Sequence, residues 1–422
     1  MKRTTKGLVW AYAIGLSLLL IMRDLWGISI SKYIYLVYIV AIMAMAPYEA
    51  VIHMTCFTLP LVCGLPGTYV MPCIWMLLVI KRKSVNIWQL MLLAFPIVWE
   101  MLAALWYPAF NVPSIVQYTF FAGVMFFLIH DDRELNYLNC VKMYLMGSIL
   151  LCATIIVAGL MTAPADWLEQ FALGQFRFGS VASGNEEGMS LLLNANSLAY
   201  YSIVAVFCAV LLAERTKKAG YIVLAIFVAF AGFLSLSRSW LLVMAICLLL
   251  YILSKLRKPK QFLTLFAVLA IVSIVLSLYL KSQPELLAGF EVRFQEDDLE
   301  SGNGRMDILK IYMEAFFSDI RYMFLGTGVT QYHAVVGLQG SMHNGTQQIL
   351  VCCGVVGFVI YIIGLIKPIL QARDQRKIRM VYWLPLLSVV LFVQTIQFLN
   401  PMMLMLPYVV GVYALRIPDK QQ

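Results

Sequence analysis

Long apolar runs recur along the whole chain of 422 residues, and they constrain its fold more than any other feature. The run WLLVMAICLLLYIL begins at Trp240, and the run FLTLFAVLAIVSIVLSLYL begins at Phe262. Such runs approach or reach the roughly 20 apolar residues that a helix needs to cross a hydrocarbon core of about 30 Å. Hydrophobic residues make up 62% of the chain, whereas a soluble domain has about 45–50% apolar residues. The sequence therefore predicts an all-α polytopic membrane protein.

Fourteen apolar segments are predicted to cross the membrane as helices. They comprise residues 7–22, 33–46, 49–62, 67–80, 86–104, 115–130, 140–161, 191–213, 219–235, 239–254, 262–280, 344–366, 380–397 and 401–415. The short segments 49–62 and 67–80 are separated by the sequence CGLPG, so a single re-entrant hairpin is the alternative for this pair. The fold class is thus a bundle of about 12–14 transmembrane helices. The segment 7–22 follows basic residues as a signal peptide does, but it lacks a small-residue cleavage site and is interpreted as a retained span.

Lys and Arg residues are divided unequally between the two sides of this arrangement. Of the 31 basic residues, 22 fall on one side, in short links and at both ends of the chain, and nine fall on the other. Because cytoplasmic links of membrane proteins are enriched in Lys and Arg, both termini are expected in the cytoplasm. The same distribution explains the formal net charge of +9, so no nucleic-acid partner is expected.

The arrangement divides the chain into five parts. They are an N-terminal transmembrane scaffold (1–161), a first outward loop (162–190), transmembrane helices with an arginine-bearing turn (191–281), a large outward loop (282–343), and C-terminal transmembrane helices with a cytoplasmic tail (344–422). Every cytoplasmic link is short, whereas the two outward loops are long. Because long ordered loops usually carry function, the functional site is expected on the outer side, chiefly in the large loop.

The large outward loop contains an apolar periodicity of its own. Helical spacing predicts an amphipathic helix over about 304–318 that lies on the membrane face, with apolar positions at Ile308, Leu309, Tyr312, Met313, Phe316 and Phe317. The acidic run EDD at 296–298 lacks both EF-hand spacing and a nearby third ligand, so a solvated loop is favoured over a metal site. The nine cysteines contain no CxxC pair, so neither a disulfide framework nor a zinc site is expected. No cofactor is expected.

Of the four histidines, His343 stands out because it directly precedes an apolar span at the outer membrane edge. It begins the sequence HNGTQQILVCCGVVGFVIY, in which Gly354 and Gly357 would allow close helix packing. A histidine titrates near neutral pH and can accept a proton from a hydroxyl group. The alternative is an interfacial histidine that is hydrogen-bonded to a loop carbonyl.

Several arginines are candidates for binding an anionic group. Arg238 lies in SLSRSWLLV, a turn of a few residues between two spans, where a charge is costly unless it is paired or functional. Snorkelling to the outer headgroups is the alternative for it. Arg293 and Arg305 lie in the large outward loop and Arg177 in the first one. The planar fork of a guanidinium group suits the oxygens of a diphosphate, although a loop arginine can simply be solvated.

Polar side chains elsewhere add candidates. Asn194 and Asn196 begin the span after the first outward loop, where they either bind sugar or phosphate or cap the helix. Asn344 follows His343 directly. Glu100 is a carboxylate inside the span 86–104, and it is either functional or close enough to the outer interface to be hydrated.

Three sequence elements, taken in order, resemble the O-antigen polymerase and ligase superfamily of bacterial envelope glycan assembly. SLSRSWLLV resembles the arginine turn of this family, and SGNGRMDILKIYMEAFFSDIRYMFLGTGV resembles its outward-loop signature. MHNGTQQILVCCGVVGFVIY resembles its histidine followed by asparagine, an apolar stretch and a Gly-x-x-Gly. The elements cover residues 235–363. Trp240, which is larger than the small residue expected in the turn, and the two cysteines before Gly354 depart from the pattern.

The resemblance implies a membrane glycosyltransferase of the GT-C-like class, with a helical domain on the outer side of a bacterial cytoplasmic (inner) membrane. Its donor would be an undecaprenyl-diphosphate-linked oligosaccharide and its acceptor a glycan or lipid, with no metal involved. Arg238 and Arg305 would hold the diphosphate, and His343 would be the catalytic base. The remaining residues expected to bind substrate are Arg177, Arg293, Asn194, Asn196 and Asn344.

The resemblance leaves several functions open. The leading interpretation is a polymerase of O-antigen, capsule or exopolysaccharide repeat units, which could act with a chain-length regulator and a flippase. The close alternative is a ligase that transfers the finished glycan to lipid A-core or another acceptor. A transporter or flippase of an anionic lipid or solute is less favoured, because it would need charges deep within several spans, and Glu100 is the main candidate for one.

Overall fold

The computed structural model describes most of the chain, and every regular element in the described part is helical. The described residues are 3–83, 85–105, 112–172, 176–179, 191, 194–256, 305–330, 332–333, 337, 342–373, 379–399 and 402–418. The side chain of Arg305 is outside the described part, although its backbone is within it.

The helices follow the predicted segments closely. The first half of the chain forms α1 (Arg3–Asp24), α2 (Lys32–Met45), α3 (Tyr48–Thr58), the 3-10 helix η1 (Leu59–Gly64), α4 (Gly67–Arg82), α5 (Ile87–Ala104), α6 (Val112–Ile129), α7 (Tyr137–Thr162) and α8 (Trp167–Ala172). The second half forms α9 (Ala195–Thr216), α10 (Gly220–Leu234), α11 (Arg238–Lys255), α14 (Arg305–Ser318), α15 (Ile320–Leu325), α17 (Gly345–Arg373), α18 (Met380–Val393), η2 (Met402–Met405) and α19 (Pro407–Leu415). These elements occupy all the predicted spans except 262–280, which lies outside the described residues.

Length and composition fit these helices to a membrane. Seven of the described helices are long and apolar enough to cross a bilayer: α1, α5, α6, α7, α9, α11 and α17. Five shorter apolar helical segments accompany them: Lys32–Met45, Tyr48–Gly64, Gly220–Leu234, Met380–Val393 and Met402–Leu415. The expected all-α polytopic membrane fold is thereby confirmed.

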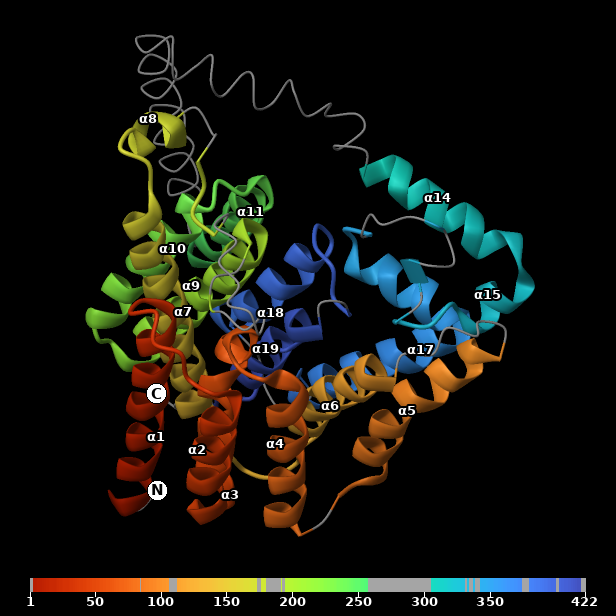
Figure 1. Cartoon of the computed structure of the whole chain (residues 1–422), viewed down its shortest axis with the longest axis horizontal. Coiled ribbons are helices and arrows are strands. Elements are labelled where there is room, and N and C mark those ends of the chain that lie inside the picture. Colours follow the sequence, from red (N-terminus) through yellow and green to blue (C-terminus); the bar gives the residue numbers. More distant parts are fainter. Residues whose placement is uncertain are drawn as a thin grey trace.

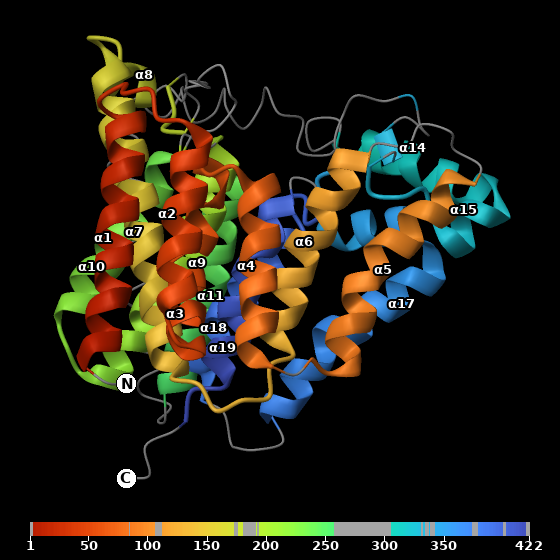
Figure 2. The same cartoon turned by 60° about the horizontal axis from the view of Figure 1, so that its bottom comes forward.

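The bundle has two ends, which are seen most clearly in Figure 2. The beginning of α1 and the end of α19 lie at one end, here named the termini end, whereas α8 and α14 lie at the opposite end, here named the loop end (Figures 1 and 2). The beginning of α1 and the end of α19 thus lie on the same side of the bundle, and the assignment of this side to the cytoplasm stays a prediction.

The segments 49–62 and 67–80 both cross the bundle and do not form a re-entrant hairpin. At the start of α3, the Tyr48 hydroxyl donates to Asp131 Oδ2 (2.5 Å) in the link between α6 and α7, at the termini end. At the end of η1, Arg23 Nη1 donates to the Gly64 carbonyl (2.6 Å), next to the end of α1 at the loop end. The helix α4 then returns, since Arg82 in its last turn contacts the same α6–α7 link.

A charged cluster around the buried pair Arg82–Asp131 holds the termini end together. Arg82 Nε lies 3.2 Å from Oδ1 of the buried Asp131, and Arg82 Nη2 lies 2.5 Å from Oδ1 of Asp132, whose side chain is 76% exposed. Arg416, which follows α19, donates through Nη1 to the Asp131 carbonyl (2.9 Å). Because removing one partner of a buried ion pair costs about 3–5 kcal/mol, this cluster fixes α4 and α19 against the α6–α7 link.

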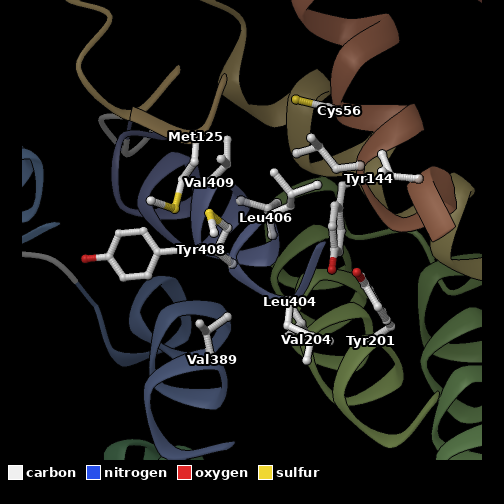
Figure 3. Packing of buried hydrophobic residues seen from close by; sticks show 14 of the residues in the cluster. Cys56, Met125, Tyr144, Tyr201, Val204, Val389, Leu404, Leu406, Tyr408 and Val409 are labelled. Carbon is white, nitrogen blue, oxygen red and sulfur yellow. The ribbon is translucent and has the colours of Figure 1, made fainter. Parts of the chain in front are cut away.

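The core lies around α9, which is buried on nearly all sides. A helix that is apolar all round belongs in the interior of a large helical protein, and α9 packs against α7, α10 and α18. Figure 3 shows Tyr144 of α7 and Tyr201 of α9 in the same cluster as Leu404 and Leu406 from the C-terminal segment. The Tyr201 hydroxyl donates to the Met403 carbonyl (3.0 Å), so the buried phenol is satisfied.

Candidate functional site

All three residues expected to be catalytic lie at or just before the beginning of a helix. Arg238 is the first residue of α11, Arg305 is the first residue of α14, and His343 lies two residues before α17. The first N–H groups of a helix have no partner within it and carry a partial positive charge, which favours an anion. At the beginnings of α11 and α14, the positive charge of the arginine therefore adds to the partial positive charge of the helix N-terminus.

The arginine turn between α10 and α11 has a strained, hydrogen-bonded backbone. Leu236 has a φ of 48°, in the left-handed region that side chains other than glycine rarely adopt. The Ser235 hydroxyl donates to the Gly232 carbonyl (2.6 Å) and accepts from the Ser237 N–H (3.3 Å). These bonds fix the turn that places Arg238, whose side chain is half-buried, at the start of α11.

Trp240 fits into this turn because the facing position is a glycine. A Cβ at Gly232 would lie 2.5 Å from Trp240 Cε2 and would also overlap the Ser202 hydroxyl, so the indole fills the space that a side chain would need. The larger residue in the arginine turn is thus accommodated by α10.

The first outward loop reaches the same turn through Phe178. The Phe178 N–H donates to the Leu234 carbonyl (3.1 Å) at the end of α10, and its buried ring lies against Gly159 of α7. Arg177, which precedes Phe178, is half-buried and lies beside the attachment point. Two of the predicted arginines, Arg177 and Arg238, therefore belong to one corner of the loop end.

A salt-bridge cluster at the termini end shows how α11 and α18 are oriented. Glu214, near the end of α9, pairs with Lys255 at the end of α11 and with Arg379 Nη2 (2.9 Å) just before α18. The first residue of α11, Arg238, therefore lies at the loop end, together with the last residues of α18.

The end of α18 contacts the first turn of α17, beside His343. Gln394 Nε2 donates to Thr346 Oγ1 (2.9 Å). The Asn344 side chain accepts from the Gln347 N–H (3.1 Å), so Asn344 is the N-cap of α17 and places the half-buried His343 directly before the helix. Arg238 and His343 thus lie at the same end of the bundle.

The predicted helix of the large loop is present as α14, but its apolar face packs on the protein. Tyr312 and Phe316 are buried, whereas Phe317 is 67% exposed. The Tyr312 hydroxyl lies 2.9 Å from His333 Nδ1, and the Tyr332 ring lies 3.9 Å from the His333 ring. Burial raises the pKa of Tyr312 to about 12. The expectation that this apolar face rests on the membrane is wrong for Tyr312 and Phe316, because α17 and the segment 332–333 cover it.

Gln348 joins this aromatic group to the start of α17. Its side chain is buried, with Oε1 accepting from the N–H groups of Phe398 and Leu399 (2.9 Å each) and Nε2 donating to the Tyr332 hydroxyl (3.3 Å). Tyr312 follows Arg305 by seven residues, which is two helical turns or about 10 Å. The middle of α14 is therefore tied to the start of α17 through Tyr332 and Gln348.

The helix α17 is broken at Gly354, within the predicted Gly-x-x-Gly. Gly354 has φ 63° and ψ 179°, which no residue inside a regular helix adopts. The Thr327 N–H donates to the Val351 carbonyl (3.1 Å), and the Gly328 N–H donates to the Cys352 carbonyl (2.9 Å). The sequence LGTG at 325–328 thus satisfies the acceptors that the break releases. Gly354 makes this break and also allows the close packing that the sequence predicts, since a Cβ there would lie 2.4 Å from the backbone of Phe324 in α15.

Gly357 also serves the close packing that the sequence predicts. A Cβ at Gly357 would lie 2.6 Å from Trp99 Cε2 of α5. The Trp99 indole Nε1 donates to both the Cys353 carbonyl and the Leu325 carbonyl (2.7 Å each). The outward-loop signature and the Gly-x-x-Gly therefore form one structural unit with α5.

Glu100, the carboxylate inside a span, is buried at this unit and bound by it. Its side chain accepts from the Val329 and Thr330 N–H groups, the latter at 3.4 Å, and from the Thr330 hydroxyl at 2.8 Å. Glu100 is 3% exposed, so the alternative of a hydrated carboxylate at the outer interface is wrong. Trp99 and Glu100 together are here named the α5 clamp.

The other predicted residues are placed as follows. Asn194 accepts from the Ser197 N–H (2.8 Å) and caps α9, which is the capping role weighed for it, and Asn196 is half-buried in the first turn. Arg293 and the run EDD at 296–298 lie outside the described residues. In the described part, no three His, Cys, Asp or Glu side chains group as metal ligands, and the nine cysteines are free thiols.

A cavity of about 860 Å³ lies at the termini end, away from all these residues. It is lined by polar groups of α5, the α6–α7 link, α17 and the C-terminal segment, among them His130, Asp132, Lys367 and Gln371. None of the predicted site residues lines it, and its lining residues Asp131 and Arg416 place it at the opposite end of the bundle from His343.

The fold and the site define an all-α polytopic membrane protein whose loop end presents arginines and a histidine at helix beginnings. Comparison with known families gives a more particular result: residues 222–362 match a family described as O-Antigen ligase. The match runs from α10 into α17 and contains Arg238, Arg305 and His343. The expected resemblance to the O-antigen polymerase and ligase superfamily is thereby confirmed. No curated protein and no solved structure matches the chain.

Proposed function

We propose that this protein is an inverting membrane glycosyltransferase that takes its glycan from undecaprenyl diphosphate. One observation carries the proposal: the family match contains Arg238, Arg305 and His343, and all three lie at or just before helix beginnings. Helix N-termini and guanidinium groups together favour a diphosphate, whose negative charge grows as it leaves.

The reaction requires one proton transfer and one displacement. His343 accepts the proton of an acceptor hydroxyl, and the hydroxyl oxygen attacks the anomeric carbon of the donor sugar. The bond from that carbon to the diphosphate breaks, and undecaprenyl diphosphate leaves with the electron pair. Arg238 and Arg305 hold the diphosphate, with Arg177 and Arg293 binding further along the donor. Asn344 holds the start of α17 and Asn194 the start of α9 through their helix caps, and Asn196 lies in the first turn of α9.

The proposed location is the outer face of a bacterial cytoplasmic membrane. The termini end contains basic residues whose hydrogen bonds and ion pairs connect its links: Arg82, Arg215, Lys255, Arg379 and Arg416. Since basic links face the cytoplasm, this end is assigned to the cytoplasm and the loop end to the outside.

The leading reaction is polymerisation of lipid-linked repeat units of an O-antigen, capsule or related polysaccharide. The second candidate is ligation of a finished glycan to lipid A-core or another acceptor. It is favoured by the description of the matched family. The two reactions share the donor and the three residues, and they differ in the acceptor.

Purified protein incubated with lipid-linked glycan tests the proposal. Wild type is expected to form new glycosidic bonds, and His343→Ala, Arg238→Ala and Arg305→Ala are expected to lose at least about 100-fold in kcat. A ladder of product lengths identifies a polymerase, and a single transfer to a core acceptor identifies a ligase. Full activity of His343→Ala would remove the base assignment. Movement of lipid-linked glycan across the membrane of vesicles, with no glycosidic bond formed, would show that the protein is a flippase and not a glycosyltransferase.

A further inference from the structure

Residues 326–330, the described backbone after α15, are held from two sides: by the α5 clamp and by the Val351 and Cys352 carbonyls of α17. Glu100 holds Val329 and Thr330, and Trp99 holds Leu325. The same Trp99 N–H also holds the Cys353 carbonyl at the break in α17. Two adjacent residues of α5 therefore bind both the loop 325–330 and the break in α17.

In the sequence, this attachment lies between Arg305 and His343. The proposed reaction depends on the position of these two residues relative to each other. Thr330 follows Arg305 by 25 residues and precedes His343 by 13. On one side, α14 and α15 lead to the clamp, and on the other side the chain returns to the start of α17. A displacement of 325–330 along α17 would move α14 relative to His343.

The chemistry of Glu100 fits positioning better than packing or proton transfer. Burying a carboxylate is costly unless its oxygens are hydrogen-bonded, and a leucine would fill the same space without that cost. A leucine, however, cannot accept from two amides and a hydroxyl. Both carboxylate oxygens of Glu100 accept hydrogen bonds from the loop, so Glu100 binds the loop and is not placed to transfer a proton to substrate.

We propose that Glu100 is a positioning residue that sets Arg305 relative to His343 by fixing residues 329–330 against α5. The inference rests on the proposed function, because it assigns Glu100 to the transfer reaction. A displacement of about 1 Å in such a site can reduce the rate about 100-fold. The loss is expected in kcat, because Arg305 acts on the charge that develops as the diphosphate leaves.

The experiment compares Glu100→Ala, Glu100→Gln and Thr330→Val with wild type. It measures kcat and KM for the lipid-linked donor, together with hydrogen exchange of the backbone amides. Glu100→Ala is expected to lower kcat about 10- to 100-fold with KM within about threefold, and to speed exchange at Thr327, Gly328, Val329 and Thr330. Glu100→Gln keeps one acceptor oxygen and should recover part of the rate. Thr330→Val changes the loop side alone and provides the test if Glu100→Ala fails to fold.

Glu214→Gln is the matched control, because Glu214 is a bound carboxylate at the termini end. It should leave exchange at 327–330 and kcat unchanged. Wild-type kcat in a Glu100 variant whose loop amides exchange freely would overturn the proposal. Faster exchange in α7 and α9 to the same extent as in the loop would also overturn it, by reducing Glu100 to a general stabilising role. An inactive wild type would instead count against the proposed function, and the exchange data would still decide whether Glu100 holds the loop.

Discussion

The backbone of Gly326 lies against that of Gly354 so closely that neither position has room for a side chain. A Cβ at Gly326 would lie 2.5 Å from the Gly354 nitrogen, and a Cβ at Gly354 would lie 2.5 Å from the Leu325 nitrogen. Both glycines also have positive φ, 75° and 63°. The break in α17 and the loop after α15 therefore fit together only because both positions are glycine.

Gly326→Ala is expected to destabilise the protein by about 2–5 kcal/mol, combining backbone strain of about 1–2 kcal/mol with steric overlap of about 1–3 kcal/mol. Gly337→Ala is the control, because Gly337 has φ 68° but no atom within 4 Å of its Cβ position. It should show the strain alone. Unfolding by denaturing detergent in mixed micelles measures both. Equal losses in the two variants would mean that the close approach to α17 contributes nothing.

Trp99→Phe removes an N–H that two carbonyls share. The Leu325 and Cys353 carbonyls lose the indole donor inside an apolar region, so a loss of about 1–3 kcal/mol in unfolding free energy is expected. Trp26→Phe alters an indole that is 66% exposed and should stay within about 0.5 kcal/mol of wild type. The same unfolding assay distinguishes them, and a neutral Trp99→Phe would show that water or another group replaces the indole.

The helices were predictable because the length of an apolar segment reflects a direct physical requirement of the bilayer. The two spans at 49–80 needed the structure, since only the contacts of Tyr48 and Gly64 show that α3 with η1 crosses the whole bundle. The order of Arg238, Arg305 and His343 was visible from motifs, whereas their distances depend on segments that have no periodic pattern.

The role of Glu100 could not be read from the sequence for a related reason. Its partners, Val329 and Thr330, are 229 and 230 residues away, and two of its three bonds go to backbone amides, which every residue carries. The break at Gly354 was hidden likewise, because a glycine within an apolar helix more often serves helix packing. The signal available was the isolated carboxylate within a span, next to Trp99.

His343 lies just before α17, whereas His333 contacts Tyr312 in the middle of α14, and the two histidines are expected to respond differently to substitution. His343→Gly should lower kcat by about 100- to 10,000-fold, and added imidazole should restore part of the rate, because a free base can occupy the vacated space. His333 is packed on Tyr332 and bonded to Tyr312, so His333→Gln should retain activity within about tenfold. If imidazole restored the activity of His333→Gly and not that of His343→Gly, His333 would be the catalytic base and His343 would not.

His130, which follows α6 at the termini end, makes the stability depend on pH. Burial lowers the pKa of His130 from its ordinary 6.5 to about 4; the bond to the Gly364 carbonyl opposes this shift, and the charges of Arg416 and Lys367 add to it. Its Nε2 lies 2.8 Å from the Gly364 carbonyl, a bond that the neutral ring can donate. Between these values the unfolded chain binds a proton that the folded protein does not.

Stability contributed by neutral His130 is therefore fully present above about pH 6.5 and is lost as the pH falls toward 4, by up to about 3 kcal/mol. The apparent melting temperature of wild type should fall over this window. His130→Gln keeps a donor for Gly364 without a titrating group, so its melting temperature should fall less. Gln371→Ala changes the same cavity without removing the histidine and should keep the wild-type slope. A slope in His130→Gln as steep as that of wild type would assign the pH dependence to other groups.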